Sequence, residues 1–278
     1  MKRQMNNLKI GFTMLFVCSC ILMVVIITGF GFADKVDGVE KKASVRKINT
    51  AEEKASNVAS KGDTREQKKA KGTSKGDTLK QKAMEIYNKN KESLVLVNKK
   101  HKLSEDYDGE LTEICDGRLE ASERLYEALN EMIRAGGNEG YSFFIASAYR
   151  SPQRQQQLLE NDVRDFMNQG MSYDKARKEA MKQTMPAGYS EHETGLALDI
   201  MTSENLVLDE NQEKMAGNKW MRKNCWKYGF ILRYPKDKQK ITKISYEPWH
   251  FRYVGKDAAK FMHKNNLTLE EFVGMLEE

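Results

Sequence analysis

The sequence contains few cysteines, and they provide little scope for disulfide bonds. Only four of the 278 residues are cysteine. Cys18 and Cys20 fall inside a long apolar run and are interpreted there as small apolar residues. This leaves Cys115 and Cys225, whose separation in sequence does not show whether they lie close enough to pair. A domain of nearly 200 residues can bury an adequate core without a disulfide, so the question stays open.

Aromatic residues are absent from 34–83, where Lys, Ala, Ser, Gly, Glu and Asp dominate. Such a segment has too little apolar surface to offset the entropy lost on ordering, so we expect a disordered basic tether. The sequence SKGDT occurs at Ser60–Thr64 and Ser74–Thr78. Two copies indicate a short duplication and not a solenoid repeat.

Charge is absent from Ile10–Ala33, a run of 24 residues preceded by Lys2, Arg3 and Lys9. A helix of this length would span about 36 Å, enough to cross a bilayer core of roughly 30 Å. The positive-inside rule then places the N-terminus in the cytoplasm and everything after Asp34 outside. A cleaved signal peptide is the alternative, but the run is longer than the usual apolar region of such peptides. We therefore predict a cytoplasmic tip and membrane anchor in residues 1–33.

The net positive charge of the chain comes from its first 83 residues. The net charge is +3 for residues 1–33, +6 for 34–83 and −3 for 84–278, which together give the overall +6. The anchor and tether can therefore favour anionic lipid or wall polymer. Nucleic-acid binding by the folded part is not expected, since that part is slightly acidic.

Residues 84–278 are predicted to form one α+β domain. Residues 94–97 suggest a short strand, 119–137 a helix, and 141–151 a second strand. Ser151-Pro152 is typical of an N-cap followed by the first residue of a helix.

The second half of this domain continues with helical patterns at 172–185 and 218–230, followed by short strands at 230–234 and within 243–255. Helices come early and strands late, without βαβ alternation. This order favours an antiparallel sheet with flanking helices.

Four histidines are present, and two of them lie among apolar residues. His192 belongs to the stretch SEHETGLALDI and His250 to EPWHFRYVG. His101 follows two lysines and His263 precedes one, so both are expected at the surface.

A carboxylate within the run GLALDI needs explanation. In a strand, Asp199 shares a face with Ala197, whereas Leu198 and Ile200 point the other way. A buried ionised carboxylate is costly unless it is paired or binds a metal. A salt bridge or a hydrogen-bonded cap would also account for it. Gly195 permits a tight turn that would fold His192 back toward Asp199.

Glu247 and His250 are separated by two residues, one of which is Pro248. The proline argues against a helix, and in a regular strand residues three apart face opposite sides. A bulge or kink at Pro248 would direct both side chains into one pocket. Two imidazoles and one carboxylate would then form a three-ligand zinc set with a position left for water, and a separate carboxylate would supply a base.

Four segments in order resemble the VanY-type zinc D-alanyl-D-alanine carboxypeptidases. The two signature segments are SEHETGLALDI and EPWHFRYVG, and LVLVNKKHKLSEDY and SAYRSPQRQQQLL match upstream segments. The resemblance runs from about Leu94 to near the C-terminus. One departure is KHKLSEDY, where a proline-rich HPLPEDY would be expected, and it lies away from the metal residues. The resemblance implies an α+β zinc-peptidase fold shared with lysostaphin-like endopeptidases and the hedgehog signalling domain.

Carried over residue by residue, the resemblance implies that His192, Asp199 and His250 bind one Zn²⁺ and that Glu247 is the catalytic base. Arg150 matches the family arginine that meets the substrate carboxylate or the developing oxyanion. Its position just before a helix N-terminus also suits an anion.

The resemblance also suggests residues around the substrate. Gln155 and Ser190 match positions that contact the C-terminal end of the peptide. Tyr149 and Trp249 are candidates to shape the pocket, although ordinary core packing explains them equally well.

The expected protein is therefore a single-pass membrane enzyme with an extracellular zinc carboxypeptidase domain. Its substrate would be the D-Ala-D-Ala end of peptidoglycan stem peptides or their precursors. Because trimming this end removes the target of glycopeptide antibiotics, the resemblance also implies a part in resistance. Two alternatives are an L,D-carboxypeptidase acting on tetrapeptides, which shares the same motifs, and a zinc-binding wall module without catalysis.

Overall fold

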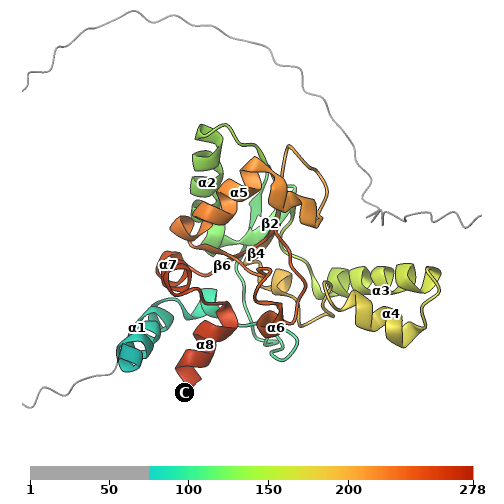
Figure 1. Cartoon of the computed structure of the whole chain (residues 1–278), viewed down its shortest axis with the longest axis horizontal. Helices are drawn as coiled ribbons and strands as arrows, with labels where there is room; N and C mark the ends of the chain where they lie inside the picture. Colours follow the sequence, from blue (N-terminus) through green and yellow to red (C-terminus); the bar gives the residue numbers. More distant parts are fainter. Residues whose placement is uncertain (1–74, 278) are drawn as a thin grey trace, which may run out of the picture. The chain divides into compact units, whose positions relative to one another are not determined.

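A four-stranded sheet lies at the centre of the folded part (Figure 1). The computed structural model describes residues 75–277. All neighbouring strands pair antiparallel, which confirms the predicted α+β class. The strand order is β3 (Phe143–Ser147), β4 (Ala197–Thr202), β6 (His250–Tyr253) and β5 (Phe230–Leu232). A separate hairpin consists of β1 (Leu111–Ile114) and β2 (Leu119–Ser122).

Helices surround this sheet. The α-helices of the described part are α1 (Lys75–Lys89), α2 (Glu123–Asn138), α3 (Pro152–Asn168), α4 (Tyr173–Ala180), α5 (Ala216–Asn224), α6 (Gln239–Thr242), α7 (Lys256–Asn265) and α8 (Leu269–Glu277). Its 3-10 helices are η1 (Lys91–Leu94), η2 (Glu191–Thr194), η3 (Glu210–Lys214) and η4 (Cys225–Tyr228).

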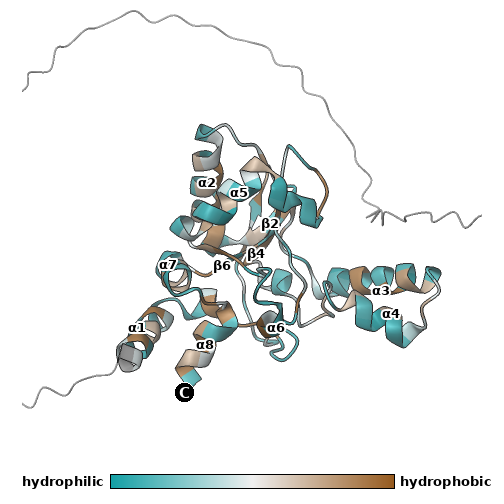
Figure 2. Ribbon diagram, viewed as in Figure 1, coloured by the Kyte–Doolittle hydropathy of each residue, from teal (hydrophilic) through white to brown (hydrophobic). Residues whose placement is uncertain are grey.

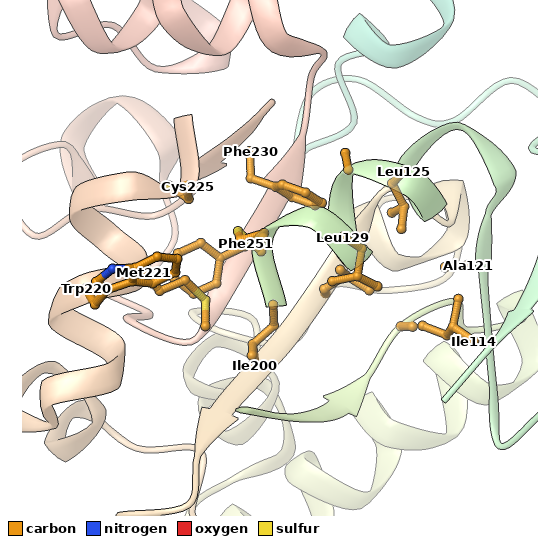
Figure 3. Close-up of a cluster of buried hydrophobic side chains, with 14 residues drawn as sticks. Ile114, Ala121, Leu125, Leu129, Ile200, Trp220, Met221, Cys225, Phe230 and Phe251 are labelled. Carbon is orange, nitrogen blue, oxygen red and sulfur yellow. The ribbon is translucent and has the colours of Figure 1, made fainter. Parts of the chain in front are cut away.

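The main hydrophobic core lies between the sheet and helices α2 and α5. Leu198 and Ile200 of β4 and Phe251 of β6 pack with side chains of both helices, among them Leu129 and Trp220 (Figure 3). The predicted alternation along β4 is confirmed. Leu198 and Ile200 enter the core, so Asp199 is directed to the opposite face.

A second core joins the two ends of the described chain. Ala83 and Ile86 of α1 are buried in a cluster with residues of α7 and α8, including Phe261 and Phe272. The sequence places residues 75–83 in a disordered tether, whereas helix α1 begins at Lys75. This boundary is wrong because the apolar positions of the segment gain burial only against the distant C-terminal helices.

The strand predicted at 94–97 is also wrong. Residues 91–94 form η1, and Leu94 and Val97 are buried without strand pairing. The guanidinium of Arg252 donates instead to the carbonyl oxygens of Ser93 and Val95, at 3.2 and 2.9 Å. A side chain thus satisfies backbone groups that a ladder would otherwise pair.

Helices α3 and α4 form a hairpin that projects from the rest of the folded part (Figure 1). As predicted, Ser151 caps α3, and its hydroxyl accepts a hydrogen bond from the Arg154 N–H at 3.2 Å. Leu159 and Val163 pack with Ala176 and Ala180 in a small core of their own. Most of α4 is hydrophilic (Figure 2), as expected of a helix buried along a single stripe.

The sequence also predicts a membrane anchor and leaves the pairing of Cys115 and Cys225 open. Within residues 75–277, no helix combines the length and the apolar character needed to cross a bilayer. The predicted anchor at 1–33 and most of the tether lie outside the described residues. Cys115 and Cys225 are both free thiols.

Candidate metal centre

Three neighbouring strands bring polar side chains into one row. Asp199 on β4 is the cross-strand partner of Ser147 on β3 and of His250 on β6. Paired residues of adjacent strands project to the same face, so these side chains meet on the side opposite the main core. The register of β3 shifts between Ile145 and Ser147, which marks an irregularity beside the site.

A tight turn brings His192 to this row. Helix η2 ends at Thr194 and is followed by Gly195, which has a φ of 70°. A Cβ at this position would lie 2.8 Å from the backbone nitrogen of Ser122, so the turn requires glycine. His192 Nε2 then lies 3.3 Å from Asp199 Oδ2. The predicted return of His192 toward Asp199 is confirmed.

A turn at Pro248 joins Glu247 to His250. The His250 N–H donates to the carbonyl oxygen of Glu247 at 3.2 Å, and Asn218 Nδ2 donates to the carbonyl oxygen of Pro248 at 2.8 Å. Glu247 Oε2 therefore lies 3.6 Å from His250 Nδ1. The irregularity predicted at the proline is present, as a turn that leads into β6.

His192, Asp199 and His250 fit a zinc ion. Each offers one ligand atom, and these atoms all lie within 4.8 Å of one another. The Asp199 oxygens lie 3.3 Å from His192 Nε2 and 3.2 Å from His250 Nδ1. These two distances involve different oxygens of Asp199, Oδ2 toward His192 and Oδ1 toward His250.

The hydrogen bonding of the ring nitrogens supports the same assignment. His192 Nδ1 donates to the carbonyl oxygen of Ala148 at 2.6 Å, which leaves Nε2 as the lone-pair donor. Among the described residues, Asp199 Oδ1 is buried without a hydrogen-bond partner, as suits an atom available to a cation.

Burial and neighbouring charges perturb the titration of these groups. Burial raises the pKa of Glu247 to about 8, and the nearby His250 and Arg150 offset only part of this rise. Burial also tends to raise the pKa of Asp199, but His192 and Arg150 hold it well below its usual value. For His250, burial favours the neutral ring, yet the nearby carboxylates of Asp199 and Glu191 raise the pKa to about 9. A carboxyl group whose pKa is raised toward neutral pH can both accept and donate a proton, which suits acid–base chemistry.

Arg150 lies directly against this group. Its Nη2 donates to Asp199 Oδ2 at 2.5 Å and its Nε donates to Ser147 Oγ at 2.8 Å. Gln155 Oε1 accepts from Arg150 Nη1 at 3.3 Å, and Gln155 Nε2 donates to the carbonyl oxygen of Met185 at 2.7 Å. Gln155, predicted as a substrate contact, is buried here and orients Arg150.

The other predicted residues flank the centre. Ser190 is buried at the N-cap of η2, Trp249 is buried in the turn before β6, and Tyr149 is half-buried beside Arg150 in the chain. His101 and His263 are exposed, as predicted.

Sequence reasoning did not single out Ser147 or Glu191. The register shift of β3 cannot be anticipated from residue patterns. Glu191 is a buried carboxylate next to His192 in the chain, and its position beside a ligand was an available signal.

The chain belongs to the VanY family of D-alanyl-D-alanine carboxypeptidases. The family model matches residues 118–256. The Bacillus subtilis (strain 168) protein YodJ is 39% identical over 200 residues, which cover 68% of this chain and 70% of the relative. The class implied by the quoted motifs is confirmed, and with it a metallocarboxypeptidase.

Two similar solved structures differ in the activity named for them, and one of them contains zinc. A variant of a vancomycin resistance D,D-pentapeptidase VanY in complex with Zn(II) aligns with a TM-score of 0.60 and 33% identity, covering 66% of this chain and 99% of that one. The LdcB L,D-carboxypeptidase aligns with a TM-score of 0.58 and 39% identity, covering 66% and 86%. The buried His-Asp-His group and the zinc-bound relative together identify zinc as the metal of this centre.

Proposed function

We propose that this protein is a zinc D,D-carboxypeptidase that releases the terminal D-alanine of peptidoglycan stem peptides ending in D-Ala-D-Ala. The observation that carries the proposal is the position of Glu247. Its buried carboxyl group lies 3.6 Å from His250 Nδ1, beside a complete His-Asp-His ligand set. A binding module would not need a proton-transferring group at that place.

The residues of the site have separate roles in the reaction. His192, Asp199 and His250 hold the zinc, which when bound polarises the penultimate carbonyl group and acidifies a water molecule. Glu247 takes a proton from that water as its oxygen adds to the carbonyl carbon. Glu247 then passes the proton to the leaving nitrogen, so that the C–N bond breaks and D-alanine departs as the amine.

Arg150 supplies the positive charge for the substrate. Its side chain is 19% exposed, the most accessible of the charged groups paired with Asp199. Held by Ser147 and Gln155, the guanidinium can donate to the terminal carboxylate or to the developing oxyanion without reorganising. Ser190, Tyr149 and Trp249 would then form the surrounding pocket.

The sequence of the N-terminal segments supports a reaction outside the cell. The uncharged run Ile10–Ala33, with basic residues before it, would serve as a single-pass anchor, and the tether would let the enzyme reach the wall. Removal of D-Ala-D-Ala ends at that site would lower the number of glycopeptide targets. Resistance is accordingly the phenotype expected of the gene.

An L,D-carboxypeptidase is the second candidate, because the similar LdcB structure has that activity. The test compares a pentapeptide ending in D-Ala-D-Ala with the corresponding tetrapeptide, using chain loaded with one zinc. We expect D-alanine release from the pentapeptide to exceed release from the tetrapeptide by more than about tenfold in kcat/KM, a difference of about 1.4 kcal/mol. A preference for the tetrapeptide would establish an L,D-carboxypeptidase. Release of D-alanine from neither peptide would overturn both candidate activities.

A further inference from the structure

A buried cluster of four charged side chains lies behind the metal centre. Glu191 Oε1 accepts from Arg233 Nε at 2.7 Å and from Arg252 Nη1 at 2.8 Å. Arg233 also makes a two-pronged ion pair with Glu270, at 2.8 and 2.7 Å. Glu191, Arg233 and Arg252 are at most 2% exposed. Two positive and two negative charges balance within the cluster, so it carries no net charge for His250 to neutralise.

The second oxygen of Glu191 has a different neighbour. Glu191 Oε2 lies 3.5 Å from His250 Nε2. Among the described residues, both atoms are buried without a hydrogen-bond partner. Leaving a buried polar atom unpaired is costly, and hydrogen bonds of this type have lengths of about 2.9 Å. A small movement of the two side chains toward each other would form a hydrogen bond between Glu191 Oε2 and His250 Nε2.

The two nitrogens of His250 therefore face different carboxylates. Nδ1 faces Asp199 at 3.2 Å and Glu247 at 3.6 Å, on the side of the zinc ligands. Nε2 faces Glu191 on the far side of the ring. When zinc takes the lone pair of Nδ1, the ring proton lies on Nε2, and the Glu191 carboxylate, which can only accept, favours this ring form.

We propose that Glu191 is a positioning residue that holds the Nε2–H of His250 and thereby presents Nδ1 to the metal. This inference rests on the proposed role of His250 as a zinc ligand. It differs from the support of His192, where a backbone carbonyl accepts the second ring proton. The charged acceptor behind His250 should make that ring the more basic ligand.

The rest of the cluster fixes Glu191 in place. Arg252 lies two residues after His250 on β6 and also donates to the carbonyl oxygens of Ser93 and Val95. Arg233 reaches Glu270 on α8. Contacts from both ends of the described chain thus converge on one carboxylate, whose Oε1 is held from two directions while Oε2 stays directed at the imidazole.

The test replaces Glu191 by glutamine in the full chain and measures zinc affinity by competition with a chelator. Loss of an acceptor that orients a metal ligand weakens metal binding by about 10- to 100-fold, and we expect a loss in this range. A second readout is the histidine ring ¹H–¹⁵N spectrum of the zinc-loaded protein. The wild type should show the His250 proton on Nε2, and Glu191→Gln, whose amide can donate to that nitrogen, should shift or remove this signal.

Glu193→Gln is the matched control. Glu193 is buried in the same turn, but its carboxylate accepts from the backbone N–H of Gly188 at 2.8 and 3.0 Å. The Glu193→Gln variant should lose thermal stability, while its zinc affinity should stay within about threefold of the wild type, a change below 1 kcal/mol. Equal zinc affinity in Glu191→Gln and the wild type, or equal losses in both variants, would overturn the proposal.

Glu191→Asp covers the case in which the glutamine variant does not fold. It keeps the charge for both arginines but withdraws the oxygen from His250. Weakened zinc binding by a folded Asp variant supports the positioning role, and unchanged binding refutes it. No peptide substrate enters these measurements, so their outcome is independent of whether the D,D specificity proposed above is correct.

Discussion

Asp199 and His250 face each other directly across β4 and β6, with Oδ1 3.2 Å from Nδ1. We expect Asp199→Asn to weaken zinc binding by more than about 100-fold, beyond the effect of groups that only orient ligands. The amide removes the negative charge and can present an N–H₂ group to the ion. Equilibrium dialysis against a zinc buffer measures the change.

Asp162→Asn is a suitable control for that variant. Asp162 is a half-buried carboxylate that accepts from Thr184 Oγ1 at 2.6 Å, within the α3 region. Its zinc affinity should match the wild type. If Asp199→Asn bound zinc equally well, Asp199 would have to be regarded as an ion-pair partner of Arg150 and not as a ligand.

Arg150→Lys tests the role of the planar guanidinium. Lysine keeps the charge but cannot donate together to Asp199, Ser147 and Gln155. We expect kcat/KM for D-alanine release to fall by about 10²- to 10³-fold, as on loss of an oxyanion donor. Zinc content should remain at one per chain.

The neighbouring variant Arg154→Lys serves for comparison. Arg154 is exposed in the first turn of α3 and donates to Gln157 at 2.9 Å. Its kcat/KM should be unchanged. Similar losses in both variants would show that the effect is not specific to the contacts that the Arg150 guanidinium makes.

Gly195→Ala should destabilise the fold by more than about 2 kcal/mol in urea unfolding. The φ of 70° disfavours alanine, and the added methyl group would meet the backbone of Ser122 at 2.8 Å. Gly137→Ala in α2 meets nothing within 4 Å and should stabilise by about 0.5–1 kcal/mol. A neutral Gly195→Ala would show that the turn presenting His192 can relax.

Much of the site could be predicted from the sequence, because its motifs are local. His192 and Asp199 lie in one short stretch, and the alternation of apolar residues assigns Asp199 to the free face of β4. The proline between Glu247 and His250 likewise indicated a break in the regular strand. What could not be predicted was which distant segments pack together.

The predictions that proved wrong failed because they depend on the packing of distant segments. Helix α1 and the segment around Leu94 take their structure from contacts with α7, α8 and Arg252, far along the chain. The pairing of Arg150 with Asp199 depends on the register of β3 against β4, which local patterns do not determine. Residue propensities alone predict a strand or a disordered tether for such segments, because the distant residues that pack against them cannot be identified from the local sequence.

Glu270→Gln should change the dependence of stability on pH. Burial tends to raise the pKa of Glu270, but Arg233 outweighs it and the pKa falls below its ordinary value of 4.5. The carboxylate therefore contributes stability above about pH 4.5, and this contribution is lost as the pH falls through the folded-state pKa. We expect the variant to lose about 3 kcal/mol at pH 7 and the two proteins to converge in acid. A constant difference across that range would argue against the ion pair.

The most direct test of the central claim is to measure zinc content and D-alanine release together in Glu247→Gln. The account predicts one zinc per chain, as in the wild type, because Glu247 is not in the ligand set. D-alanine release from a D-Ala-D-Ala pentapeptide should fall by at least about 10²-fold, since glutamine cannot accept the proton of the attacking water. Full release by a zinc-loaded Glu247→Gln variant would contradict the account.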